Sequence, residues 1–175
     1  MVHERVRHLR RRHQGERGFS LIELLVTLAI IAVIVAASAP YFLNYWRAAS
    51  TRAAARELTA ALNQGRQIAI AGNCSVRMVT DGVASLRFLD PAAPPACNWR
   101  NPTTGVVITT WVGSGTDGQG WMKLTNNIQL AGPGANVVFT NLGAAAPGGV
   151  YTLRNPVDNQ TLTVTVAGSG RITTP

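Results

Sequence analysis

The chain has 175 residues and a formal net charge of +8, and its three histidines all lie within the first 13 residues. That length has room for one domain and a membrane anchor. Residues 19–175 contain no histidine, which excludes Ser-His-Asp and Cys-His nucleophilic sites and zinc sites built on histidine.

The acidic residues after residue 18 form no pair placed for acid–base catalysis. They are Glu23, Glu57, Asp81, Asp90, Asp117 and Asp158. We therefore expect no enzyme, no cofactor and no metal site. The glycine-rich stretch at residues 113–118 matches G-x-G-x-x-G, but no helix is predicted after it, so we interpret it as a loop rather than a pyrophosphate site.

Residues 1–18 form a basic head with six arginines and two glutamates. Such a head is typical of a positive-inside signal rather than a nucleic-acid arm, and its length fits a leader that is removed. An ordinary secretory signal peptide cut after Ala39 is the alternative. Pro40 directly follows that point, which disfavours the cut, and the apolar run is longer than the usual ~7–15 residues.

Residues 19–45 form an apolar stretch, and no charge occurs from Leu24 through Trp46. About 20 such residues cross a ~30 Å hydrocarbon layer as a helix. Glu23 stands at the start of this stretch, and a carboxylate in a membrane segment is costly, which makes it a functional candidate. The alternative is that Glu23 lies at headgroup depth. Pro40 removes one backbone hydrogen bond and is expected to kink the helix.

The stretch RGFSLIEL at residues 17–24 resembles the class III signal of type IV pilins and type II secretion pseudopilins. The resemblance implies that a prepilin peptidase cuts after Gly18 and N-methylates Phe19. It implies that Glu23 pairs with the Phe19 amine of a neighbour during filament assembly, and Pro40 matches a proline of the family. The implied partners are the peptidase, other pilins or pseudopilins in a filament tip or shaft, an inner-membrane assembly platform and membrane lipid. The implied location is a single pass of the inner membrane, with a cytoplasmic N-terminus and a periplasmic domain.

Residues 46–72 continue the helix as an amphipathic segment. Tyr41, Tyr45 and Trp46 precede it and resemble an interfacial aromatic belt. The apolar face is predicted to comprise Ala54, Leu58, Ala61, Leu62, Gly65, Ile68 and Ala69. A single helix over residues 19–71 would be about 80 Å long, and Gly72 and Asn73 are its predicted stop.

Residues 73–175 are predicted to form a β-rich domain. Strands are expected at residues 75–80, 83–89, 105–112, 121–124, 136–140, 150–154 and 161–167, with a last piece near Arg171. Asp81-Gly82 predicts a tight hairpin, residues 90–102 a loop, and Trp99, Trp111 and Trp121 packing positions. The fold class is therefore α+β, a long N-terminal helix packed on an antiparallel β domain.

Two cysteines, Cys74 and Cys97, enclose a loop of 24 residues. Outside the inner membrane, an oxidising compartment favours a disulfide between them, with a buried pair of free thiols as the alternative.

The second half also resembles the H-type minor pseudopilins and the FimT-like minor pilins. The similar segments are residues 62–73, Gly120-Trp121, Val138-Phe139 followed by Gly143, and residues 168–172. The resemblance implies a structural subunit of a type IV pilus-like filament, for type II protein secretion or pilus biogenesis.

The alternative function is DNA binding during natural transformation. Some FimT-like pilins bind DNA through a C-terminal Gly-Arg-x-Arg motif. Gly170 and Arg171 match its first half, but Thr173 replaces the second arginine. Arg154 and Lys123 are further candidate contacts, since phosphate contacts give salt-dependent affinity without sequence preference.

Overall fold

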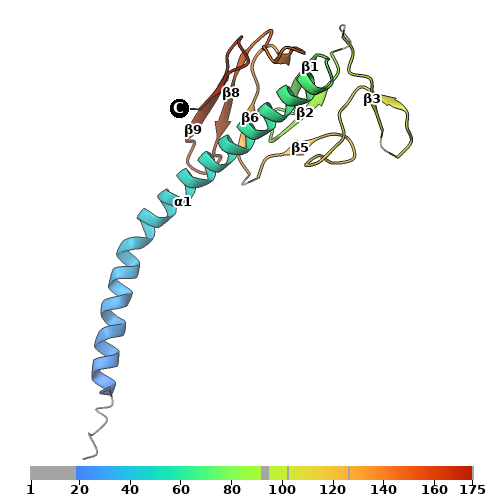
Figure 1. Ribbon diagram of the computed structural model, residues 1–175. Helices are drawn as coiled ribbons and strands as arrows, with labels where there is room; N and C mark the ends of the chain where they lie inside the picture. Colours follow the sequence, from blue (N-terminus) through green and yellow to red (C-terminus); the bar gives the residue numbers. More distant parts are fainter. Residues whose placement is uncertain (1–18, 92–94, 102, 126, 175) are drawn as a thin grey trace, which may run out of the picture. The chain divides into compact units, whose positions relative to one another are not determined.

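The computed structural model describes residues 19–91, 95–101, 103–125 and 127–174, so the predicted leader with Gly18 lies outside the described residues. The described residues form the helix α1 (Leu21–Ala71) and ten strands (Figure 1). The strands are β1 (Val76–Thr80), β2 (Ser85–Leu89), β3 (Trp99–Arg100), β4 (Val107–Ile108), β5 (Met122–Lys123), β6 (Gln129–Ala131), β7 (Val138–Phe139), β8 (Gly149–Arg154), β9 (Thr161–Val166) and β10 (Ile172–Thr173). The chain divides into two units, residues 1–41 and residues 42–175.

The predicted fold class is confirmed: a long N-terminal helix is followed by antiparallel sheets. One sheet has the strand order β5-β2-β1-β7 and another the order β10-β9-β8-β6, while β3 and β4 form a separate pair. All the paired strands are antiparallel. The longest pairing joins β8 and β9 from Gly149 opposite Val166 to Arg154 opposite Thr161, and Figure 1 shows the two strands side by side.

The helix ends in a Schellman motif. Asn73 has a positive φ of 47°, which asparagine tolerates better than most residues. The Cys74 N–H donates to the Ala69 carbonyl at 3.0 Å, and the Asn73 N–H donates to the Ile70 carbonyl at 3.2 Å. These two hydrogen bonds satisfy carbonyl groups of the last helical turn that have no donor within the helix. The helix stops as predicted, but Asn73 rather than Gly72 adopts the left-handed conformation.

One face of α1 enters the core of the second unit. Its buried residues are Thr51, Ala54, Ala55, Leu58, Ala61, Leu62, Gly65 and Ala69. The predicted apolar face is therefore confirmed, except that Ile68 is only partly buried. At Gly65, α1 approaches β1 and β2 closely, because an added Cβ would lie 2.7 Å from the Met78 sulfur and 2.9 Å from the Phe88 ring.

Strands β3 and β6 were not predicted, and the strand expected at residues 105–112 is shorter than expected. β3 falls within the expected loop at residues 90–102. After β4 the chain changes partner: Val107 and Ile108 pair with β3, whereas Thr110 bridges to Leu89 at the end of β2. The run of β-branched residues is therefore split between two pairing partners. The alternation of residues along the sequence does not show where a strand changes its partner.

The β1–β2 turn is built around Asp81 and is longer than a two-residue hairpin. Asp81 N–H donates to the Ser85 carbonyl, and the Asp81 carboxylate accepts N–H bonds from Val83, Ala84 and Ser85 at 2.8–2.9 Å. Partial burial opposes ionisation, but these bonds outweigh it and lower the pKa of Asp81. Because the folded pKa is the lower one, this contribution to stability is present at neutral pH and is lost as the pH falls through that pKa.

We predict that Tyr151→Phe stabilises the domain. Tyr151 is 1% exposed, and no described residue hydrogen-bonds its hydroxyl. Burial raises the pKa of Tyr151. A buried hydroxyl without a partner costs about 1–3 kcal/mol, so its removal should raise the free energy of unfolding by about 1 kcal/mol in urea titrations of the purified chain. Tyr151→Leu is the control, and it should lower stability by leaving a cavity. A loss of stability in Tyr151→Phe would show that the hydroxyl is satisfied.

Candidate assembly site

The described part of the first unit, residues 19–41, is an apolar helical segment that no other described residue covers. Its most hydrophobic 18-residue window has a mean hydropathy of 2.7, and none of that window is buried. By length and composition it is able to cross a membrane. Exposed fractions range from 51% at Val26 to 78% at Leu21 among the large apolar side chains between Leu21 and Val35. This surface requires lipid or neighbouring helices to cover it.

Two hydroxyl groups inside this segment donate to backbone carbonyls of the helix itself. The Thr27 hydroxyl donates to the Leu24 carbonyl at 2.9 Å, and the Ser38 hydroxyl donates to the Ile34 carbonyl at 2.7 Å. Such internal bonds allow both side chains to lie in hydrocarbon at little cost. Pro40 lies inside α1, where it can donate no backbone bond. The predicted kink there stays a prediction.

Glu23 differs from these hydroxyls because it has no partner among the described residues. It lies in the first turn of α1, where Ser20 provides the carbonyl that accepts the Leu24 N–H at 3.1 Å. Ser20-Leu-Ile-Glu23 has the spacing of a capping box, yet the described structure contains no side-chain bond between its two ends. The carboxylate lies at the positive end of the helix and is not used by any side chain that the structure describes.

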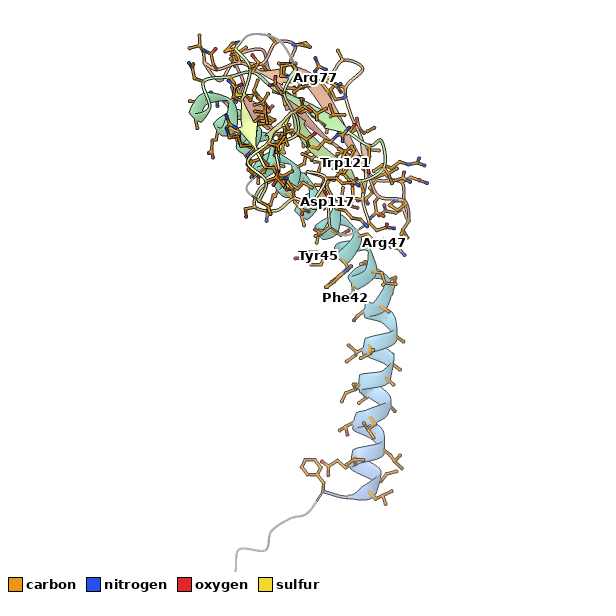
Figure 2. The ribbon with its side chains drawn as sticks, turned by 90° about the vertical axis from the view of Figure 1, so that its right-hand side faces the viewer. Phe42, Tyr45, Arg47, Arg77, Asp117 and Trp121 are labelled. Carbon is orange, nitrogen blue, oxygen red and sulfur yellow. A yellow bond between two sulfur atoms is a disulfide. The ribbon has the colours of Figure 1, made fainter. Side chains whose placement is uncertain are left out.

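An exposed aromatic group lies at the start of the second unit. Phe42, Tyr45 and Trp46 are 61%, 70% and 65% exposed, and the Phe42 and Trp46 ring centroids are 6.0 Å apart. Figure 2 shows Phe42 and Tyr45 pointing away from the helix. Aromatic side chains of this kind favour the boundary between lipid and water. Tyr45 and Trp46 belong to the predicted belt of Tyr41, Tyr45 and Trp46, and its position at a membrane interface stays a prediction.

A junction of two glycines holds the last turn of the domain against α1. The Arg66 Nε donates to the Gly143 carbonyl at 2.8 Å. Gly143 and Gly170 both have positive φ, 80° and 79°. A Cβ on Gly170 would overlap the Gly143 carbonyl oxygen, so the two turns meet backbone to backbone. These glycines lie in segments that suggested the family resemblance, and the contact gives a physical reason for them.

Cys74 and Cys97 are joined by a disulfide, with their Cα atoms 4.9 Å apart. The bond connects the end of α1 to the segment before β3. The Cys97 N–H also donates to the Asp90 carboxylate at 3.1 Å, a bond inside the loop that the disulfide encloses.

We predict that removing this disulfide lowers stability. The double variant Cys74→Ala/Cys97→Ala should lose about 3 kcal/mol, because a cross-link over some 24 residues restricts the unfolded chain. Urea unfolding of oxidised and reduced wild type gives the same comparison without a mutation. Equal stability of the oxidised and reduced chains would contradict the prediction.

The three predicted DNA-contacting cations lie on separate parts of the domain. Arg154 ends β8, and Arg171 follows the turn after β9, so the pairing of β8 with β9 puts them at opposite ends of these strands. At ~3.3 Å per residue that separation is roughly 15–20 Å. Lys123 lies on β5, an edge strand of the other sheet. Arg154 also donates to the Asn159 side chain, so part of its guanidinium is already used.

Comparison with known families agrees with this arrangement. The model of the prokaryotic N-terminal methylation motif matches residues 13–39, and the model of the type II transport protein GspH matches residues 54–170. A methylation motif at the head of an apolar helix, followed by an antiparallel β domain, defines the pilin-like class. The chain belongs to the GspH family of type II transport proteins, whose members are structural subunits.

Two solved structures of the type IV minor pilin FimU from Pseudomonas aeruginosa strain PAO1 are also similar. They have TM-scores of 0.46 and 0.45 and sequence identities of 15% and 16%. Each match covers 71% of this chain, and 87% and 91% of the two FimU chains. No curated protein matches the chain.

Proposed function

We propose that this chain is a minor pseudopilin that assembles into a type IV pilus-like filament for type II protein secretion. The main support is the apolar helix with Glu23 at its head, a carboxylate that has no partner among the described residues. Glu23 lies within the methylation motif, and the GspH domain follows the apolar segment. The family description, a type II transport protein, favours secretion over pilus biogenesis.

In this proposal the chain is made as an inner-membrane precursor with a cytoplasmic N-terminus and a periplasmic domain. Prepilin peptidase removes residues 1–18 and methylates Phe19, residues 19–45 anchor and assemble the subunit, and residues 46–72 carry residues 73–175. An assembly platform in the inner membrane then extracts the subunit into the filament.

The chemistry of assembly rests on the two charges at the new N-terminus. An unpaired carboxylate in hydrocarbon costs several kcal/mol, and the Phe19 amine of a neighbouring subunit is a cation at a similar depth in the membrane. The pairing of Glu23 with that amine therefore determines the axial position of an incoming subunit relative to its neighbour. The shallow groove lined by Val26, Ala29, Ile30, Val33 and Ile34, about 370 Å³, provides a surface on which a neighbouring helix can pack.

The experiment is mass spectrometry of the protein recovered from sheared filaments. The expected N-terminus is N-methyl-phenylalanine at residue 19. An intact leader, or absence of the chain from filaments that contain the other subunits, would overturn the proposal. Loss of secretion but not of pili in a strain lacking the chain would support the secretion role. The reverse result would assign it to pilus biogenesis.

DNA binding for natural transformation remains the alternative, but the geometry favours it less. Arg154, Arg171 and Lys123 form no single surface. Retardation of DNA by the chain at low salt, reduced by Arg171→Ala, would support this alternative.

A further inference from the structure

We propose that the hollow between α1 and the last strands, here called the arginine pocket, receives an acidic side chain from a different pilin-like subunit. It encloses about 190 Å³ and is lined by Arg52, Ala55, Arg56, Leu162 and Thr174. The inference rests on the proposed function, because it presupposes a filament.

The pocket concentrates positive charge that no residue described by the structure neutralises. Arg52 and Arg56 are one helical turn apart on α1, and both are exposed. Within the part of the chain that the structure describes, neither guanidinium has a hydrogen-bond or ion-pair partner. Leu162 of β9 supplies an apolar wall, and Thr174 supplies a hydroxyl beyond β10. Two guanidinium groups beside a small, partly apolar pocket are suited to bind a planar carboxylate carried on one or two methylene groups.

A second copy of this chain is a poor donor of that carboxylate. Residues 19–175 contain ten basic and six acidic residues, so two copies repel each other. The carboxylates of the β domain already accept bonds from their own chain: Asp81 from its turn, Asp117 from Gln119 and Trp121, and Asp158 from Gln160. Glu57 accepts two bonds from Thr125 in the same way. The fitting occupant is an Asp or Glu on another subunit.

A lipid phosphate is the rival occupant, and the position along the helix disfavours it. Arg52 and Arg56 follow Trp46 by six and ten residues, which is roughly 9 and 15 Å at 1.5 Å per residue. The headgroup layer on each side of a bilayer is only about 5–8 Å thick. With Trp46 at the lipid boundary and the helix along the membrane normal, Arg56 lies beyond the headgroups.

The test uses the full chain in cells that assemble filaments, with a photo-crosslinking amino acid at Thr174. The expected adduct joins this position to another pilin-like subunit, through a peptide that contains Asp or Glu. Arg52→Glu/Arg56→Glu should abolish the adduct and lower the amount of the chain in sheared filaments about tenfold or more, since like charges across an interface cost several kcal/mol.

Lys123→Glu/Arg154→Glu is the matched control, because it changes the charge equally away from the pocket. It should alter filament recovery less than about twofold, as expected for exposed charges. Arg52→Gln/Arg56→Gln removes the attraction without adding repulsion, and it should give a smaller loss with leader cleavage and protease resistance unchanged.

Three results would overturn the inference: both pocket variants recovered in filaments in the same amount as the unmodified chain, an adduct with phospholipid, or an adduct with a copy of this chain.

The amount of the unmodified chain in filaments distinguishes failure of the proposed function from failure of the arginine pocket. If the wild type is absent, the proposed function fails. If it is present and indifferent to the pocket variants, only the arginine pocket fails.

Discussion

Gly170→Ala is expected to unfold the β domain or to lower its stability by about 3 kcal/mol or more. The residue has a φ of 79°, a conformation that costs an L-residue about 1–2 kcal/mol. Its new Cβ would also overlap the Gly143 carbonyl oxygen, which belongs to the backbone and cannot rotate away. Overpacking of this kind adds typically about 1–3 kcal/mol. Displacement of this carbonyl would also strain the hydrogen bond that it accepts from Arg66.

The matched control for Gly170→Ala is Gly168→Ala, two residues earlier in the same turn. A Cβ there would lie 3.8 Å from the Ala145 carbonyl oxygen, an ordinary contact, and its φ is not positive. Urea unfolding should therefore separate the two variants by at least about 2 kcal/mol. Equal midpoints would show that the Gly143 turn moves freely, which would contradict the packing described for this junction.

Glu23→Gln is expected to lower the amount of the chain in filaments about tenfold or more while leader cleavage continues. Glutamine has nearly the same shape but carries no charge, so it cannot form the proposed ion pair with the Phe19 amine of a neighbour. Leaving one member of a buried ion pair unpaired costs about 3–5 kcal/mol, and every 1.4 kcal/mol is a factor of ten. Immunoblots of sheared filaments and membranes give the ratio, and mass spectrometry gives the cleavage.

Thr27→Val controls for a general effect of changing polarity in this segment. The Thr27 hydroxyl donates only within its own helix, so its loss should change incorporation less than about twofold. Wild-type incorporation of Glu23→Gln would mean that Glu23 lies among headgroups and pairs with no subunit. A precursor of Glu23→Gln with an intact leader would place the role of Glu23 in processing instead.

The helix could be predicted well because its signals are local. Twenty apolar residues, a Gly-Asn stop and a stripe of alanine and leucine depend only on spacing along the chain, and α1 ends where Gly72-Asn73 indicated. The short strands are different. β3, β4 and β6 have two or three residues each, and their partners are chosen by contacts distant in sequence. A strand of two or three residues is too short to show the alternation of apolar and polar residues that predicts a strand.

The candidate site also has one part that the sequence predicts and one part that it does not. The position of Glu23 at the head of the helix follows from the sequence alone, as does its distance from Pro40. The arginine pocket does not, because Arg52 and Arg56 lie outside the predicted apolar face and would face solvent in a helical projection. Only the return of β9 and of the chain after β10 brings Leu162 and Thr174 beside the two exposed arginines. The signal that could have suggested it is a pair of arginines at i and i+4 without an acidic residue at matching spacing.

The long burial of α1 determines how the subunit bears mechanical load. From Thr51 to Ala69 the helix is held by the sheets over about 27 Å, and Arg66 adds a bond near the far end. Tension along the helix axis is thus shared in shear by all these contacts at once, whereas a sideways pull would open them one at a time. In the proposed filament, the domain should therefore resist stretching along the helix axis far better than peeling.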